Sequence, residues 1–340
     1  MSRGAVLFLV LSFLLVFGFV SFPSLAQQKK VVALDVTPGR VKDLDAEIGQ
    51  EQLAKLEDYL RSWGYEVKEL TSITSDSLKG VDVLIIGKMK DYKSGFKPEE
   101  IQAIASWFKQ GGKLLWVGSD SDYVEPYLNP EDTSFKAGEP NKILEAIGSS
   151  VRIDYASLED PESNAGAAYR VVSYKANTQG WAAEITSGAS KVLFHGPSVL
   201  AGFKDGKFVP FDDVVGDNVV WLYRSSDKGT IVSHDGVDPK AYNVGQTGSF
   251  VEAAAEKIAV GGSYSKVIIT IESLLGDRTI INEEYHGVKL QGPTFVKNAL
   301  AWGTTVESAG LPMEWIIAIV VIIIVVVILA LLLVKRGKKS

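Results

Sequence analysis

The 340-residue chain contains no cysteine. This absence excludes disulfide bonds, thiolate catalysis and cysteine-ligated metal sites. The chain also lacks any Asn-x-Ser/Thr acceptor for N-linked glycans, and it has only three histidines. A domain without disulfides depends on its apolar core, and a chain that is 46% apolar is able to form one.

Charge of one sign is in excess. Acidic residues outnumber basic ones by 41 to 35, which gives a formal net charge of −6. An acidic surface repels phosphate backbones, so we expect no nucleic-acid partner. A solvated acidic surface and a cationic partner are the two interpretations that remain.

The N-terminus has the pattern of an export signal. Arg3 precedes the apolar run 5–20, and the small residues Ser24 and Ala26 follow a proline. This pattern predicts a secretory signal peptide over 1–26, and the alternative is an uncleaved signal anchor.

The C-terminus carries a second long apolar run. Residues 315–334 are uncharged, and a helix of that length, rising about 1.5 Å per residue, matches a bilayer core. Basic residues fill the tail 335–340, and such tails stay cytoplasmic. The sequence therefore predicts a single-pass cell-membrane protein that contacts the lipid bilayer through 315–334. Its ectodomain, 27–303, would lie outside on a short stalk, 304–314.

Four apolar runs suggest the fold of the ectodomain. Amphipathic helical patterns separate them, and one such helix begins at Pro98 and ends near Phe108. Apolar strands that alternate with helices predict an α/β, flavodoxin-like and mostly parallel sheet with helices on both faces. The four predicted strands are 31–36, 82–87, 113–118 and 266–271.

The middle of the chain has a different pattern. Residues 150–247 are rich in short strands and turns, including an Asp205-Gly206 hairpin signal. No linker precedes them, so we expect an antiparallel β elaboration of the same domain. Residues 250–259 are expected to be helical, and "PTFVKNALAW" predicts a closing helix.

The stretches "DVLIIG", "GGKLLWVGSDSD", "KVIITIESLL" and "LQGPTFVKNALAWG" occur in this order. Together they resemble the extracytoplasmic class I glutamine amidotransferase-like domains. Such domains occur in accessory proteins of gliding-motility-type ABC transporters, in an intraflagellar-transport protein and in uncharacterised exported bacterial and archaeal proteins. The resemblance spans roughly residues 30–303, and Glu272, Ser273, Asn298 and Trp302 occupy its closing positions.

This resemblance implies a fold and a binding or scaffolding role, with ABC transporter subunits as possible membrane protein partners. Amidotransferases of this superfamily use a cysteine at the elbow after a buried strand. The chain has none, so the resemblance does not extend to that reaction.

The turn after the third predicted strand reads Gly-Ser-Asp-Ser-Asp, with Ser119 as its candidate nucleophile. A serine nucleophile needs a positioned base, usually histidine, and His234 is a candidate because it ends a predicted strand. The Gly-x-Ser-x-Gly frame of a nucleophile elbow is missing, however. We therefore predict no catalytic residue and no enzyme, and a degenerate serine hydrolase is kept as an alternative.

Polar side chains follow the buried strands, where ligands bind in open α/β folds. A carboxylate-rich edge with one lysine suits a sugar or an amine, and the alternative is an empty edge closed by internal salt bridges. Calcium was considered for the acidic turn, but EF-hand spacing is absent, so no metal and no cofactor is predicted. The candidate ligand-binding residues are Asp35, Lys88, Ser119, Asp120, Asp122 and Glu272.

Three functional hypotheses follow. The first is a membrane-anchored, non-enzymatic extracellular binding or scaffolding domain, an accessory subunit of a membrane transport complex. The second is a tethered receptor for a small polar ligand such as a sugar. The third is a degenerate or rewired serine hydrolase.

Overall fold

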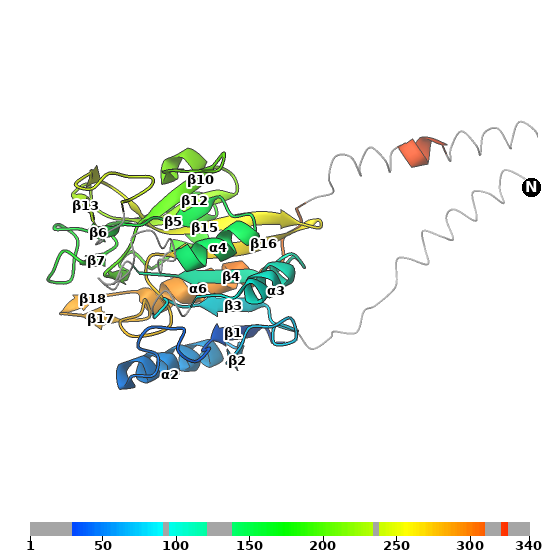
Figure 1. Cartoon of the computed structure of the whole chain (residues 1–340), viewed down its shortest axis with the longest axis horizontal. Helices are drawn as coiled ribbons and strands as arrows, with labels where there is room; N and C mark the ends of the chain where they lie inside the picture. Colours follow the sequence, from blue (N-terminus) through cyan, green and yellow to red (C-terminus); the bar gives the residue numbers. More distant parts are fainter. Residues whose placement is uncertain (1–28, 91–94, 121–137, 234–237, 310–320, 326–340) are drawn as a thin grey trace, which may run out of the picture.

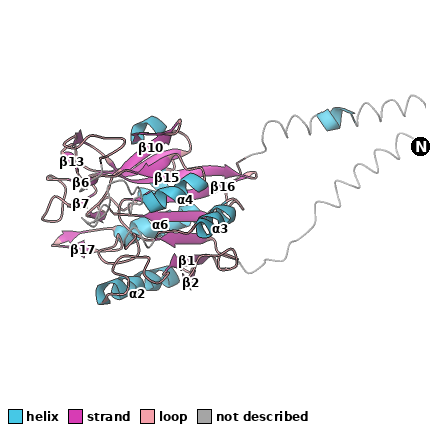
Figure 2. Ribbon diagram, in the orientation of Figure 1, coloured by secondary structure: helices cyan, strands magenta, loops and turns pink. Residues whose placement is uncertain are grey.

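The computed structural model describes residues 29–90, 95–120, 138–233, 238–309 and 321–325 (Figure 1). Its centre is an eight-stranded sheet in the order β2-β1-β3-β4-β16-β15-β12-β8 (Figure 2). The four predicted apolar strands all lie in this sheet. Its first five strands run parallel: β2 (Glu66–Leu70), β1 (Val31–Asp35), β3 (Val83–Ile86), β4 (Leu114–Gly118) and β16 (Ser263–Thr270).

The other three strands correct the expected sheet. β15 (Val251–Val260), β12 (Val219–Arg224) and β8 (Lys175–Ala176) pair antiparallel, so the sheet is mixed rather than mostly parallel. β15 is also the segment expected to be helical. Gly261 and Gly262, both with positive φ, make the tight turn that joins it to β16, and β12 pairs with its other edge. Pairing on both edges overrides the helix propensity of its alanines and glutamates.

Four longer helices accompany the sheet among the described residues: α2 (Glu47–Ser62), α3 (Pro98–Phe108), α4 (Gly138–Ala146) and α6 (Gly292–Thr304). The sequence explains their placement, since α2 buries Leu53, Leu56 and Leu60 at helical spacing. α6 packs against β3, β4 and β16, and Phe295 meets Trp116 edge-on at 5.5 Å between ring centroids.

Between β4 and β15, described strands other than β8 and β12 form small antiparallel sheets beside the main one. Asp205 and Gly206, both with positive φ, make the predicted hairpin turn between two of these strands. The remaining elements are β5 (Val151–Ile153), β6 (Ser157–Glu159), β7 (Arg170–Val172), α5 (Ala182–Thr186), β9 (Leu193–His195), β10 (Leu200–Lys204), β11 (Lys207–Pro210), the 3-10 helix η2 (Phe211–Val214), β13 (Gly229–Val232), β14 (Thr247–Gly248), β17 (Glu284–Tyr285) and β18 (Val288–Lys289).

The predicted transmembrane helix is not supported. Within the described part of the chain, no helix has both the length and the apolar character needed to cross a bilayer. Spanning requires about 20 continuous helical residues, whereas the only described part of 315–334 is the short helical segment 321–325. The predictions of a single-pass topology, a membrane localisation and a bilayer contact are corrected with it. The signal peptide 1–26 and the tail 335–340 lie outside the described residues.

Candidate functional site

Three strands bring a buried charge cluster together at the carboxyl end of the sheet. Lys88 follows β3, Asp120 follows β4 and Glu272 follows β16, so parallel neighbours deliver all three to one edge. The Lys88 Nζ lies 3.3 Å from Asp120 Oδ2, 3.5 Å from Glu272 Oε1 and 2.9 Å from Asp277 Oδ1. We call these four residues the Lys88 cluster.

Asp277 was not predicted from the sequence. It lies in the irregular segment after β16, where no strand marks its position. The signal that was available is the preceding Gly276, whose φ is +107°. A Cβ there would lie 2.6 Å from the Lys42 carbonyl oxygen and 3.2 Å from Lys88 Cε, so only glycine lets the chain approach the lysine.

The electrostatics of the Lys88 cluster are those of a closed internal network. Burial would lower the pKa of Lys88, but attraction to Glu272, Asp120 and Asp277 outweighs it and raises that pKa. Burial raises the pKa of Glu272 to about 8, against the attraction of Lys88. Burial also acts to raise the pKa of Asp277, yet Lys88 holds it below its usual value. Lys88 thus favours the ionised form of Asp277, while Glu272 holds a proton near neutral pH.

Solvent barely reaches this site. The side chains of Lys88, Asp120 and Glu272 are at most 3% exposed. Gly118 closes the edge further, because a Cβ there would lie 2.7 Å from Ser273 Cα. The Ser273 hydroxyl oxygen accepts hydrogen bonds from the Lys88 and Leu275 N–H groups. Among the described residues, Lys88 is therefore already paired with the acidic side chains at this edge.

Ser119 has the position of a nucleophile but not its surroundings. It is 1% exposed, and its hydroxyl donates to the carbonyl oxygen of Asp120 at 3.2 Å. The His195 backbone N–H donates to Glu272 Oε2. The imidazole ring of His195 meets the rings of Tyr169 and Tyr285 edge-on. Among the described residues, then, no imidazole is seen bonded to the serine. His234 lies outside those residues.

Asp35 does not join the cluster. Its Oδ2 accepts from Arg40 Nη1 at 2.9 Å, and the Thr37 hydroxyl donates to its Oδ1 at 2.6 Å. The other guanidinium nitrogen of Arg40 donates to Glu100 of α3 at 2.6 Å. Asp35 ends β1 at the carboxyl edge of the sheet, as expected, but there it pairs with a cation from the loop after β1 rather than with Lys88. Asp122 lies outside the described residues.

His195 should make stability depend on pH. Burial, reinforced by Arg278 and Lys88, lowers its pKa from 6.5 to about 4. As pH falls from 6.5 to 4, the unfolded chain gains a proton that the folded chain refuses, so folding stability is lost over that window. We expect His195→Phe to flatten this loss in urea unfolding series at pH 7, 5.5 and 4. The exposed His286→Gln should keep the wild-type profile, and identical slopes for all three proteins would contradict the assignment.

Comparison with known proteins gives the fold alone. No family model matches the chain, and no curated protein matches it. The mmIFT52 N-terminal domain superposes with a TM-score of 0.52 at 13% identity, covering 81% of this chain and 97% of that one. A ThuA-like protein from Bacteroides uniformis gives 0.44 at 13% identity, covering 86% of this chain and 98% of its own. At these identities the chain shares an architecture with the first of these structures.

Proposed function

We propose that this protein is a non-enzymatic binding domain that works by holding a protein partner, with a subunit of a membrane transport complex as the expected partner. The observation that carries the proposal is the closure of the sheet edge by Lys88. In an open α/β fold this edge is the usual ligand site, and here an internal lysine occupies it.

The chemistry at the edge supports a role without catalysis. Acyl transfer needs an accessible nucleophile, a base beside it and donors aimed at the developing oxyanion. Ser119 is buried, and its hydroxyl donates a hydrogen bond to a backbone carbonyl oxygen. The neighbouring Asp120 carboxylate would repel an oxyanion rather than stabilise it. A sugar receptor at this edge is disfavoured for a related reason, since the side chains that would contact the sugar are buried and already paired with Lys88.

The test has two parts. We expect a fluorophosphonate probe to leave Ser119 unlabelled, and a panel of ester, amide and glycoside substrates to show no turnover that Ser119→Ala abolishes. The Ser119→Ala variant should also unfold at a urea concentration close to that of the wild type, because one weak local hydrogen bond is lost. Labelling at Ser119 that disappears in Ser119→Ala would overturn the proposal.

The second part addresses the partner. The wild-type protein, recovered by affinity from cross-linked membranes of the cells that make it, should carry transport-complex subunits in a fixed ratio. Ser119→Ala should recover the same subunits. Recovery of no membrane protein above the level of an unrelated acidic control domain would contradict the proposed partner class.

A further inference from the structure

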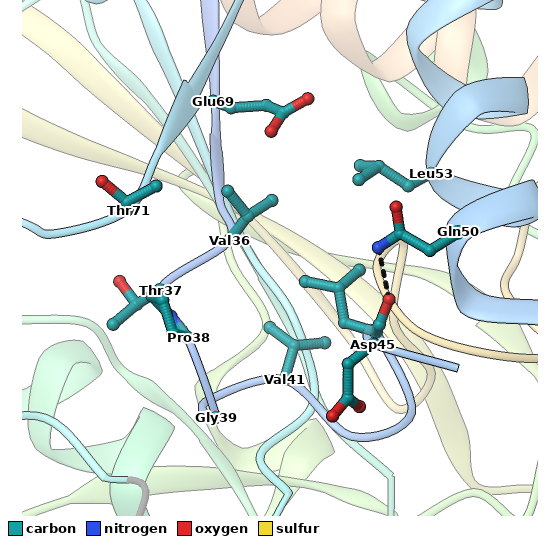
Figure 3. Close-up of a pocket in the computed structure, with 11 residues that line it drawn as sticks. Val36, Thr37, Pro38, Gly39, Val41, Asp45, Gln50, Leu53, Glu69 and Thr71 are labelled. Carbon is teal, nitrogen blue, oxygen red and sulfur yellow. Dashed lines mark hydrogen bonds between the residues drawn. The ribbon is translucent and has the colours of Figure 1, made fainter. Parts of the chain in front are cut away.

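A second site lies apart from the Lys88 cluster. A pocket of about 280 Å³ opens beside the carboxyl ends of β1 and β2 and the start of α2 (Figure 3). Val36, Val41 and Leu53 give it an apolar wall. Its volume is at the lower end of the range for small-molecule pockets, so it fits a short ligand or the end of a longer one.

The polar groups of this pocket present acceptors. The Thr37 hydroxyl and backbone N–H both donate to Asp35 Oδ1, at 2.6 and 3.2 Å, so toward a ligand the Thr37 oxygen is left to accept. The Gln50 Nε2 donates to the Leu44 carbonyl oxygen at 2.6 Å. Figure 3 shows that this bond turns the Gln50 Oε1 the other way, toward Leu53.

Charge adds to this pattern. Asp45 and Glu69 contribute carboxylates to the lining, and the lining residues that the structure describes include no lysine, arginine or histidine. Burial and the nearby Glu57 raise the pKa of Glu69, while Arg61 acts in the opposite direction. Arg61 is itself paired with Glu57 at 3.0 Å. Around Glu69, two carboxylates therefore share a single cation. A second cation in the pocket would reduce the repulsion between these carboxylates.

We propose that this pocket binds an alkylammonium group, either of a small free amine or of a lysine side chain. The N–H donors of the ammonium would bond to the Gln50 Oε1 and the Glu69 carboxylate, and the alkyl chain would lie on Val36, Val41 and Leu53. An anion is repelled here, and a neutral alcohol supplies one donor where the ammonium supplies three. The inference goes beyond the proposed function and does not depend on it, because it concerns different residues at a different end of the sheet edge.

The test compares four probes by isothermal titration calorimetry on the full chain at pH 7. n-Butylamine should bind saturably and at least about tenfold more tightly than n-butanol, and butyrate should not bind. Nα-acetyl-lysine methylamide distinguishes the two sources. If both this compound and butylamine bind, a lysine side chain can reach the pocket. If butylamine binds and this compound does not, the ligand is a small free amine.

Two substitutions on one strand provide the matched control. Glu69→Gln removes the charge at the pocket and should weaken butylamine binding by about tenfold. Glu66→Gln removes an exposed carboxylate of β2 that does not line the pocket, and should leave the affinity unchanged. Equal binding of butylamine and butanol, equal effects of the two substitutions, or no saturable amine binding at millimolar concentration would each overturn the proposal.

Discussion

Lys88→Met is expected to destabilise the fold by about 3–5 kcal/mol, the usual cost of removing one partner from a buried ion pair. The lysine side chain is buried and is the one described cation within 4 Å of Asp120, Glu272 and Asp277 together. Methionine preserves the length and apolar stem of the side chain. The loss would therefore report the charge rather than a cavity. The measurement is the free energy of urea unfolding at pH 7.

The pH dependence of this loss is a sharper expectation. In Lys88→Met, Asp277 would lose its strongest electrostatic partner and keep Arg278, so burial should raise its folded-state pKa above the wild-type value. Groups with raised folded pKa values add stability below their unfolded pKa and lose it as pH rises. In the wild type the pKa of Asp277 is lowered, so the stability that Asp277 contributes is lost as pH falls. The difference in the free energy of unfolding between the wild type and Lys88→Met should consequently be smaller at pH 4 than at pH 7.

Lys79→Met is the matched control. Lys79 pairs with Asp76 at 2.7 Å, but both side chains are largely exposed, so its loss should change the free energy of unfolding little at either pH. If Lys88→Met were as stable as Lys79→Met at pH 7, the Lys88 cluster would not be the closed, charge-balanced network described above. Adding Asp277→Asn to Lys88→Met should recover part of the loss, because it removes a buried carboxylate that Lys88 no longer balances.

The sequence could predict the strands of this site because burial on both faces leaves a continuous apolar run. β3 and β4 are such runs, fully buried along their length, and the polar residues after them were therefore placed at one edge. It could not predict which of those residues pair. Asp35 ends β1 as Asp120 follows β4, at the same edge of the sheet, yet Asp35 pairs with Arg40, five residues later. The loops decide which charged residues pair, and hydrophobic periodicity does not predict the conformation of a loop.

Two further differences have the same origin in tertiary structure. The composition of β15 favours a helix, and only the strands on either side of it make it extended. The alkylammonium pocket requires α2 to begin beside the ends of β1 and β2, with Gln50 turned by the Leu44 carbonyl. The sequence of a single segment predicts neither the pairing of β15 nor the contacts of this pocket. The apolar run 315–334 shows the converse, because hydropathy alone predicted a spanning helix that the described residues do not contain.

Phe108→Ala is expected to cost about 3–5 kcal/mol, the range for truncating a buried aromatic residue. Phe108 is fully buried in the core, where its ring lies 6.5 Å from that of Trp107. In the sequence, Trp63 follows Leu56 and Leu60 at helical spacing, and this pattern by itself predicts a buried residue and the same cost for Trp63→Ala. The structure separates the two, because Trp63 lies at the C-terminal end of α2, is only partly buried and stacks on Tyr59 at 5.3 Å.

Trp63→Ala should therefore cost less, about 1–2 kcal/mol, because the indole loses less contact with the core and leaves a gap that water can fill. Urea unfolding at one temperature measures both variants, and an unchanged m value would show that the comparison concerns the folded state. Equal losses would mean that the end of α2 is held as tightly as the centre of the core. A larger loss for Phe108→Ala would show that burial in the assembled fold, rather than helical spacing, sets the contribution of an aromatic residue to stability.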